Sequence, residues 1–309
     1  MTRILVAGLI NYETIVGVDE FPVDYKPVRY PFHRIRGSVS GVGYNVAKAL
    51  TMLGDPVRFL SLTGRDPASA VVRDALLRDN IDSSHILNVM DETPQSVILC
   101  DDSGRRAINV DLKNIQDTSF PVERFAEALD GCDMAVLCNI NFSRPLLAIA
   151  SARGVPIATD VHCVSDLDDS YNRDYMAAAT VLFMSGESLP CDPEEWLRRL
   201  TAQYRNEIVV IGLGASGALL FDSRRQTLVR MPAVPTRPIR NATGAGDALF
   251  SCFVHYHARG EEPEAALHKA MIFASWKLGG RGGADGFLTE GELEAKYCAI
   301  RHGAHQVIV

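Results

Sequence analysis

The segment Asn241–Asp247, which reads NATGAGD, places two glycines and an acid at the start of a predicted helix. Apolar side chains follow at Leu249, Cys252 and Phe253, on one helical face. The glycines let the backbone turn tightly, so the first amides of the helix are free to bind an anion such as phosphate. Asp247 would then lie where a base can take a proton from an attacking hydroxyl. Because the helix dipole alone favours an acid in the first turn, this segment by itself leaves a structural role open.

The elements that must position this turn alternate between short apolar runs and amphipathic stretches. Such alternation predicts an α/β fold, in which a parallel sheet is covered by helices on both faces. The predicted strands are Ile4–Ile10, Val57–Leu62, Met134–Cys138, Pro156–Thr159, Val181–Met184 and Ile208–Ile211. The predicted helices are Tyr44–Leu53, Ala68–Asp79, Arg144–Ala152 and Pro193–Tyr204.

Two β-rich segments interrupt the alternation. Thr14–Ser40 contains strand-like pieces, and Gln95–Val110 reads as a hairpin around a polar turn. Together they predict a small sheet that stands off the main body, and a lid over an active site is one use for such a sheet.

Composition narrows the class of protein. The chain has 309 residues, of which 47% are hydrophobic, and a net charge of -7, which argues against nucleic-acid binding. No apolar stretch is long enough to span a membrane, and the apolar run Ile4–Ile10 lacks the form of a secretory signal. The seven cysteines are odd in number and include no C-x-x-C pair, which predicts reduced thiols in a cytoplasmic protein.

The glycine turn resembles the C-terminal signature of the ribokinase-like, or PfkB, sugar kinases. Four further segments resemble this family in its order and spacing: Gly8–Asn11, Ser40–Gly54, Gly64–Asp66 and Val210–Gly217. The resemblance covers nearly the whole chain. It implies one kinase domain over residues 1–309, with a three-layer α/β/α ribokinase-like fold and a small β-sheet lid formed by about 12–40 and 95–112.

The resemblance implies roles for individual residues in phosphoryl transfer from ATP. Asp247 would be the catalytic base, and the amides of Gly244, Ala245 and Gly246 would hold the γ-phosphoryl group. Phosphoryl transfer depends mainly on positioning and charge neutralisation, so this division of labour is chemically sufficient. The residues that the resemblance places at the substrate are Asn11, Glu13, Gly41, Asn45 and Asn114.

For the nucleotide, the resemblance implies Gly214, Gly217, Thr243 and Gly283 as ATP-binding residues. It also implies that Glu187 positions Mg²⁺ through water.

Several residues depart from the family pattern. Asn241 and Ala242 replace an Asp and a Thr or Ser that help to build a monovalent-cation site in some members, which leaves activation by potassium open. Ser185 replaces a frequent Asn near the metal, and Tyr44 replaces a small residue. Glu13 replaces an Asp, which keeps the charge but moves it by one methylene group.

Three functions remain open. The first is a kinase for a primary hydroxyl of a free sugar. The second is a nucleoside kinase, and the third is a non-catalytic homologue that binds a sugar or a nucleotide. In a nucleoside kinase, the candidates for stacking on the base are Tyr12, Phe32, Tyr44 and Phe142.

Charge and apolar surface predict two further properties. Glu13 at the pocket favours a neutral substrate, whereas a phosphorylated sugar would need basic residues. The candidates for that role are Arg34, Arg36, Arg105, Arg106 and Lys113. A small sheet cannot bury both of its faces alone, so we expect a homodimer through the lid.

Three other motifs have plainer interpretations. Gly212–Gly217 matches the dinucleotide fingerprint, but a strand rather than a helix follows, which argues against NAD. Asp166, Asp168 and Asp169 are interpreted as a solvated loop rather than a metal cluster. His162 follows Asp160 near the edge of the sheet where ligands bind, although an ordinary loop histidine fits as well.

Overall fold

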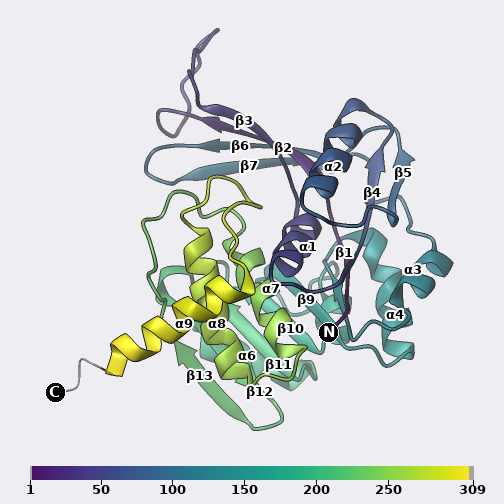
Figure 1. Ribbon diagram of the computed structural model, residues 1–309, viewed down its shortest axis with the longest axis vertical. Coiled ribbons are helices and arrows are strands. Elements are labelled where there is room, and N and C mark those ends of the chain that lie inside the picture. Colours follow the sequence, from purple (N-terminus) through teal and green to yellow (C-terminus); the bar gives the residue numbers. More distant parts are fainter. Residues whose placement is uncertain (1, 306–309) are drawn as a thin grey trace.

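The computed structural model describes residues 2–305, with side chains as far as Arg301. Within these residues, a nine-stranded sheet forms the centre of the molecule, in the order β13-β12-β11-β10-β9-β8-β1-β4-β5 (Figure 1). Its strands are β1 (Ile4–Ala7), β4 (Val57–Gly64), β5 (Ile86–Met90), β8 (Met134–Leu137), β9 (Ile157–Cys163), β10 (Val181–Ser185), β11 (Ile208–Gly212), β12 (Ala218–Asp222) and β13 (Thr227–Met231). Pairing is parallel from β5 to β11 and antiparallel at β12 and β13.

Helices cover both faces of this sheet, because its central strands are apolar on both sides. In β1, Ile4 and Val6 belong to one apolar cluster, and Leu5 and Ala7 to the other. One face carries α1 (Val42–Met52), α2 (Pro67–Arg78), α7 (Ala245–His257), α8 (Pro263–Lys277) and α9 (Glu290–His305). The opposite face carries α3 (Val122–Leu129), α4 (Arg144–Ala152), α5 (Arg173–Ala178) and α6 (Pro193–Gln203). The predicted α/β/α layering is confirmed.

The predicted elements have the observed types, with small shifts at their ends. The first strand ends at Ala7 rather than Ile10, and β9 continues from the predicted end to Cys163. The helix α2 begins after Asp66, whose carboxylate accepts a hydrogen bond from Ser69 N at 3.2 Å as an N-cap. No described helix is long and apolar enough to cross a membrane.

Within the described chain, four strands form a second, small sheet in the order β3-β2-β6-β7. They are β2 (Asn11–Gly17), β3 (Ile35–Ser40), β6 (Gln95–Cys100) and β7 (Arg106–Asp111). Figure 1 shows this sheet projecting from the main body, above the yellow loop that precedes α9. Both predicted β-rich segments therefore contribute to one sheet.

Successive side chains of the small sheet alternate between its two faces. The register places Asn11, Glu13, Ser40, Ser96 and Arg106 on one face, which we call the inner face. The outer face carries Val16, Ile35, Val97 and Leu99 instead.

Two glycines allow α1 to approach the end of β1 closely. A Cβ atom on Gly43 would lie 2.4 Å from the carbonyl carbon of Gly8, and a Cβ on Gly8 would lie 2.7 Å from Gly43 Cα. The N-cap residue of α1, Gly41, has a φ of 105°, a conformation that favours glycine. This contact fixes where the first turn of α1 lies relative to β2.

Candidate functional site

The glycine turn opens α7 as the sequence predicts. Gly244 is the N-cap residue with a φ of 76°, and a Cβ atom there would lie 2.3 Å from the carbonyl oxygen of Gly283. The helical hydrogen bond from Ala248 N to Gly244 O is 3.0 Å long. Because the N–H groups of the first turn precede the helical hydrogen-bond ladder, those of Gly246 and Asp247 can bind an anion.

Asp247 lies in the first turn of α7 with only 8% of its surface exposed. Its Oδ2 accepts a hydrogen bond of 2.7 Å from Asn45 Nδ2 on α1. Burial raises the pKa of the Asp247 carboxyl, while the hydrogen bond from Asn45 partly opposes this rise. A carboxylate with a raised pKa, held next to free amides, has the properties of a general base at a phosphoryl-transfer site.

The inner face of the small sheet brings two more polar residues to this place. Asn11 donates from Nδ2 to Ser96 Oγ at 2.9 Å, and both Asn11 and Glu13 are more than nine-tenths buried. Among the described residues, Asn11 Oδ1 and Glu13 Oε1 have no hydrogen-bond partner. Burial also raises the pKa of Glu13, although a contact with the Ser40 hydroxyl opposes the shift. Two buried oxygens without partners are suited to accept hydrogen bonds from a ligand.

The loop before α9 closes the gap between the small sheet and the glycine turn. A Cβ atom on Gly283 would lie 2.8 Å from Ser40 Oγ and 3.3 Å from Asn45 Nδ2. Gly283, predicted to bind ATP, is therefore packed beside the residues predicted for the substrate. Its contact with Gly244 places it next to the phosphate-binding turn as well.

Two basic side chains reach Thr243, the residue before the glycine turn. Arg106 Nη1, on the inner face of the small sheet, donates to Thr243 Oγ1 at 3.3 Å. Lys277 Nζ, at the end of α8, donates to the carbonyl oxygen of Thr243. Lys277 gives no signal in the sequence, because a lysine in the last turn of a helix is ordinary and favoured by the helix dipole.

The segment Asp160–His162 lies at the same edge of the sheet. A Cβ atom on Gly246 would lie 4.0 Å from Asp160 Oδ2, and Asp160 Oδ1 accepts a 2.8 Å hydrogen bond from His162 N. His162 has a φ of 56°, which turns the chain as β9 ends. Asp160 and His162 therefore flank the anion-binding turn, in agreement with their predicted place at the ligand-binding edge.

The turn between β11 and β12 carries Gly214 and Gly217, which were predicted to bind ATP. Gly217 has a φ of 95° and packs so closely on β13 that a Cβ atom would lie 2.0 Å from Met231 O. At the end of the neighbouring strand β10, Glu187 is exposed, and its N–H donates to Ser185 Oγ at 3.2 Å. These three residues lie next to the ends of the adjacent strands β10, β11 and β12.

The structure corrects two of the candidates for stacking on a nucleoside base. Tyr44 and Phe142 are each only 2% exposed, because Tyr44 packs in the core with its hydroxyl on Asp79 and Phe142 packs against Phe120. Neither ring has a free face. Residue type and spacing do not separate a core aromatic residue from one that lines a pocket, and so this prediction was wrong for both residues.

Three other predicted residues are not brought to Asp247 by the contacts described. Asn114 is exposed on the turn after β7, where its carbonyl oxygen accepts a hydrogen bond from Thr118 Oγ1. Phe32 is 78% exposed and stacks on Tyr30. Tyr12 lies on the outer face of the small sheet, against Gly37.

Several of the basic residues near the small sheet already form ion pairs with carboxylates. Arg34 pairs with Asp19 and Asp102, and Lys113 pairs with Glu92 and Asp111. Arg105 pairs with Asp101. Arg36 shares the inner face with Arg106.

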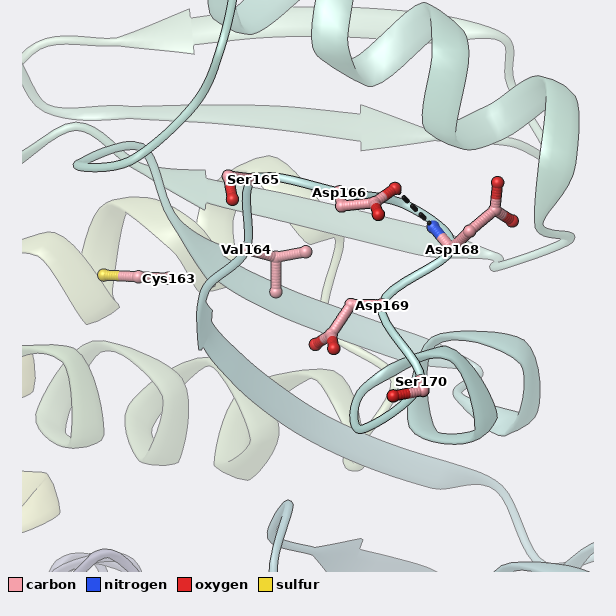
Figure 2. Close-up of a pocket in the computed structure, with 7 residues that line it drawn as sticks. All are labelled: Cys163, Val164, Ser165, Asp166, Asp168, Asp169 and Ser170. Atoms are coloured by element: carbon pink, nitrogen blue, oxygen red, sulfur yellow. Dashed lines mark hydrogen bonds between the residues drawn. The ribbon is translucent and has the colours of Figure 1, made fainter.

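The loop after β9 holds a surface hollow of about 440 Å³, lined by Cys163–Asp166 and Asp168–Ser170. Figure 2 shows the carboxylates of Asp166, Asp168 and Asp169 pointing in different directions. Asp166 accepts a hydrogen bond from Asp168 N, and Asp169 Oδ2 accepts one from Asn172 Nδ2. Within the described part of the chain, no group of three or more His, Cys, Asp or Glu residues could hold a metal ion. The two hydrogen bonds use the carboxylates of Asp166 and Asp169 to shape the loop.

Comparisons with known proteins agree with this geometry. The family model described as pfkB family carbohydrate kinase matches residues 1–150 and 181–290. Acarbose 7(IV)-phosphotransferase of an Actinoplanes species is 26% identical over 279 residues, which cover 89% of this chain and 91% of that protein. Deoxyribokinase of Salmonella typhi is 26% identical over 305 residues, covering 90% and 93% of the two chains.

Solved structures share the fold. A microbiome-derived acarbose kinase superposes with a TM-score of 0.84 at 23% identity, covering 95% of this chain and 98% of that chain. A putative ribokinase from Agrobacterium tumefaciens gives a TM-score of 0.85 at 20% identity, covering 97% and 99%. The family match spans most of the chain and includes the glycine turn, so this protein belongs to the PfkB family of carbohydrate kinases.

Proposed function

We propose that this protein transfers the γ-phosphoryl group of ATP to a primary hydroxyl of a small, uncharged sugar. The observation that carries this proposal is the position of Asp247, which is buried at the open N-terminus of α7 and held by Asn45. The unpartnered oxygens of Asn11 and Glu13 supply acceptors for further hydroxyls at the same place.

The reaction follows from this arrangement. Asp247 accepts the proton of the substrate hydroxyl, the hydroxyl oxygen bonds to the γ-phosphorus, and the bond from phosphorus to the departing ADP breaks. The amides in the first turn of α7 hold the charge that collects on the transferring group. Gly244, Ala245 and Gly246 remain our proposed phosphoryl-binding residues, although Ala245 N already makes a 3.3 Å hydrogen bond to Ala242 O.

The nucleotide has its own proposed contacts. ATP supplies the phosphoryl group, and Mg²⁺ supplies positive charge on its phosphates. We propose that Thr243 and Gly283 lie near the phosphates, because Thr243 directly precedes Gly244 in the chain and Gly283 packs against Gly244. Gly214 and Gly217 are proposed to line the nucleotide farther away, and the exposed carboxylate of Glu187 to bind the water shell of Mg²⁺.

A sugar is favoured over a nucleoside by the side chains that are available. The described acceptors are carboxylate and amide oxygens, which suit hydroxyl groups. Two of the aromatic residues that we considered for a base are buried in the core. The relatives include kinases named for deoxyribose and acarbose, which fits a sugar. Gly41, which shapes the start of α1, and Asn45 complete the proposed sugar contacts, while Asn114 needs a movement of its exposed turn to join them.

A neutral sugar is favoured over a phosphorylated one by charge. Glu13 and Asp247 both face the proposed pocket, and a phosphate dianion there would be repelled. Arg34, Arg105 and Lys113 are already paired with carboxylates. Arg36 and Arg106 are therefore the basic residues that a phosphorylated sugar would have to use.

A side-by-side assay tests the proposed function. We expect ATP-dependent phosphorylation of at least one compound among ribose, deoxyribose, fructose, acarbose, adenosine, cytidine and fructose 6-phosphate. A sugar should give the highest kcat/KM. The highest value for a nucleoside would support the alternative nucleoside kinase, and a preference of about tenfold or more for fructose 6-phosphate would contradict the neutral substrate. ATP binding without turnover of any compound would support a non-catalytic homologue.

We also propose that the protein forms a homodimer through the outer face of the small sheet. Ile35 is 58% exposed and Val97 is 41% exposed there, and Val16 and Leu99 are half-buried beside them. Pairing with a second copy would remove this apolar surface from water. Sedimentation at tens of micromolar should show a dimer, and Val97→Glu should convert it to a monomer. A wild-type monomer with full activity would contradict the dimer.

The cytoplasm remains our proposed compartment. Cys132, Cys138 and Cys252 are buried thiols that form no disulfide bond. Reduced, buried thiols are typical of proteins in a reducing compartment. Fractionation of the source cells should place the protein with cytoplasmic markers.

A further inference from the structure

Lys277 is a fully buried lysine whose partner is a backbone carbonyl. It is the last residue of α8, it has no exposed surface, and its Nζ donates to the carbonyl oxygen of Thr243. Burying an ammonium group is costly unless the group is paired, so a buried lysine normally has a specific role. In this protein it lies directly behind the turn that opens α7.

The hydrogen bond from Lys277 also sets the direction of an amide in the glycine turn. The peptide bond is planar and trans, so the carbonyl of Thr243 and the N–H of Gly244 point in opposite directions. The Lys277 side chain holds the Thr243 carbonyl toward the protein interior. The N–H of Gly244 therefore points away from the interior. Polarising the carbonyl also makes that N–H a stronger donor.

The charges around Lys277 come from four different parts of the chain. Asp247 on α7, Asp285 on the loop before α9 and Glu13 on β2 all attract its ammonium group, whereas Arg106 on β7 repels it. Burial is the main influence and lowers the pKa of Lys277 to about 8, so the ammonium group is still charged at neutral pH. The cluster therefore holds a fixed positive charge among carboxylates that would otherwise repel the phosphates.

We propose that Lys277 is a positioning residue that acts as an internal monovalent cation. Its ammonium group holds the Thr243 carbonyl, directs the N–H of Gly244 at the transferring phosphoryl group, and balances the charge of Asp247 and Glu13. This proposal rests on the proposed phosphoryl transfer.

The neighbouring residues fit this role. Some members of the family carry an acid and a hydroxyl residue here that help to build a monovalent-cation site. This chain has Asn241 and Ala242 at these positions instead. The side chain of Asn241 is used in the turn itself, where Oδ1 accepts from Thr243 N at 2.8 Å and Nδ2 donates to Arg281 O at 2.8 Å. A fixed ammonium group supplies the positive charge here, so transfer needs no added potassium.

The wild-type protein gives the first test. With Mg·ATP and the best sugar, kcat should be the same in potassium chloride and in tetramethylammonium chloride at equal ionic strength. Activation by potassium of about tenfold or more would overturn the proposal.

Variants of Lys277 give the second test. Lys277→Met keeps most of the length of the side chain and removes the charge, and kcat should fall by about 10²–10³-fold, as for loss of one transition-state donor. Lys277→Ala leaves space at Thr243, so added potassium or methylammonium should raise the kcat of this variant about tenfold. A folded Lys277→Met variant with unchanged kcat would overturn the proposal.

Lys269 gives a matched control on the same helix. It is also buried, but its Nζ pairs with the carboxylates of Glu261 and Glu294 at 2.8 and 2.7 Å. Lys269→Met should lower the melting temperature and leave kcat and its cation dependence unchanged. An equal loss of kcat in both variants would mean that any buried charge on α8 matters, and would overturn a specific role for Lys277.

Binding of the non-hydrolysable analogue AMP-PNP separates this proposal from the proposed function. Calorimetry should give the same Kd for wild type in potassium and in tetramethylammonium, and a weaker, potassium-sensitive Kd for Lys277→Ala. These values decide the role of Lys277 even if no compound in the substrate panel is phosphorylated. A potassium requirement for binding by wild type would overturn the internal cation, and it would do so without folded Lys277 variants.

Discussion

Two glycine-rich turns in this protein have similar sequences but different surroundings. Gly212–Gly217 connects β11 to the antiparallel strand β12, whereas Gly244–Gly246 opens the helix α7. In the first turn, the N–H groups of Leu213, Ser216 and Gly217 all donate to carbonyls within the turn. In the second, the N–H groups of the first helical turn precede the hydrogen-bond ladder. The element that follows the glycines decides whether their amides can bind an anion.

The acid near each turn shows the same difference. Asp222 ends β12 and accepts hydrogen bonds from the N–H groups of Arg224 and Arg225, so its charge is used to shape the next turn. Asp247 instead receives a side-chain hydrogen bond from Asn45 and faces the anion-binding amides. Four experiments separate these two surroundings.

The largest effect is expected for Asp247→Asn. Loss of the general base should lower kcat by about 10²–10⁴-fold, while the fold and ATP binding remain. Steady-state kinetics and calorimetry with AMP-PNP measure both. The matched control is Asp222→Asn, which should lower stability and leave kcat near that of wild type. If Asp247→Asn keeps more than about half of the wild-type kcat, Asp247 is not the base.

The second-largest effect is expected for Gly246→Val, because the space beside Gly246 is open to a ligand rather than filled by protein. Outside its chain neighbours and the backbone of α7, the nearest atom to a Cβ on Gly246 is Asp160 Oδ2 at 4.0 Å, and Gly246 has no positive φ. The backbone conformation at this position therefore does not require a glycine. Gly246→Val should fold and lose kcat by more than about 10²-fold, because its side chain occupies the phosphoryl site.

Gly217 is the counterpart of Gly246 in the other turn. Any Cβ atom there would contact Met231 O, and its φ is positive. Gly217→Ala should therefore lower the free energy of unfolding by about 1–3 kcal/mol, as judged by denaturant titration. Normal turnover by Gly246→Val would show that the phosphates bind elsewhere.

The pH dependence of kcat reports the ionisation of two residues in the charge cluster, Asp247 and Lys277. Burial raises the pKa of Asp247, so kcat should fall on the acid side as this carboxylate gains a proton, at a higher pH than for an exposed Asp. Asn45→Ala removes the hydrogen bond that favours the carboxylate and should move this acid limb to still higher pH.

On the alkaline side, the Lys277 ammonium group loses its proton as the pH rises through about 8. The kcat of wild type should therefore decline above this pH, and the decline should be absent in Lys277→Met. A flat alkaline profile for wild type would argue against a charged Lys277 in the active form.

The smallest effect is expected from the small sheet. Arg106→Ala removes the 3.3 Å hydrogen bond to Thr243 Oγ1 and should raise the KM for ATP by about twofold to tenfold, as for one hydrogen bond. Arg105, the neighbouring residue, pairs with Asp101 instead, so Arg105→Ala should leave KM unchanged. Equal effects of the two variants would show that general charge, rather than contact with Thr243, matters.

Much of the fold could be predicted because its central strands are short, apolar on both faces and separated by amphipathic helices. The helix predicted over Arg144–Ala152 has the observed bounds, since Pro145 and the apolar spacing mark its start and its buried face. The predicted strand ended before β9 does, because His162 and Cys163 are polar or exposed residues, which carry no strand signal of their own.

The site was predictable only where a motif fixes it. Asp247 follows from the glycine turn, whereas Lys277 depends on a contact across 34 residues that spacing does not reveal. Tyr44 shows the opposite error, because its burial results from the close packing of α1 and its contact with Asp79. Local patterns report the backbone, and long-range packing decides which side chains meet.

The contact between Gly8 and Gly43 has a consequence for the tolerance of this protein to mutation. Neither glycine is among the proposed substrate contacts, yet each leaves no room for a single methyl group at the crossing of α1 and β1. A substitution at either position must shift the first turn of α1, which carries Asn45 toward or away from Asp247. In a saturation screen for growth or turnover, these two positions should therefore be as intolerant as the active-site residues. Such a screen, read without the structure, would misplace them in the pocket.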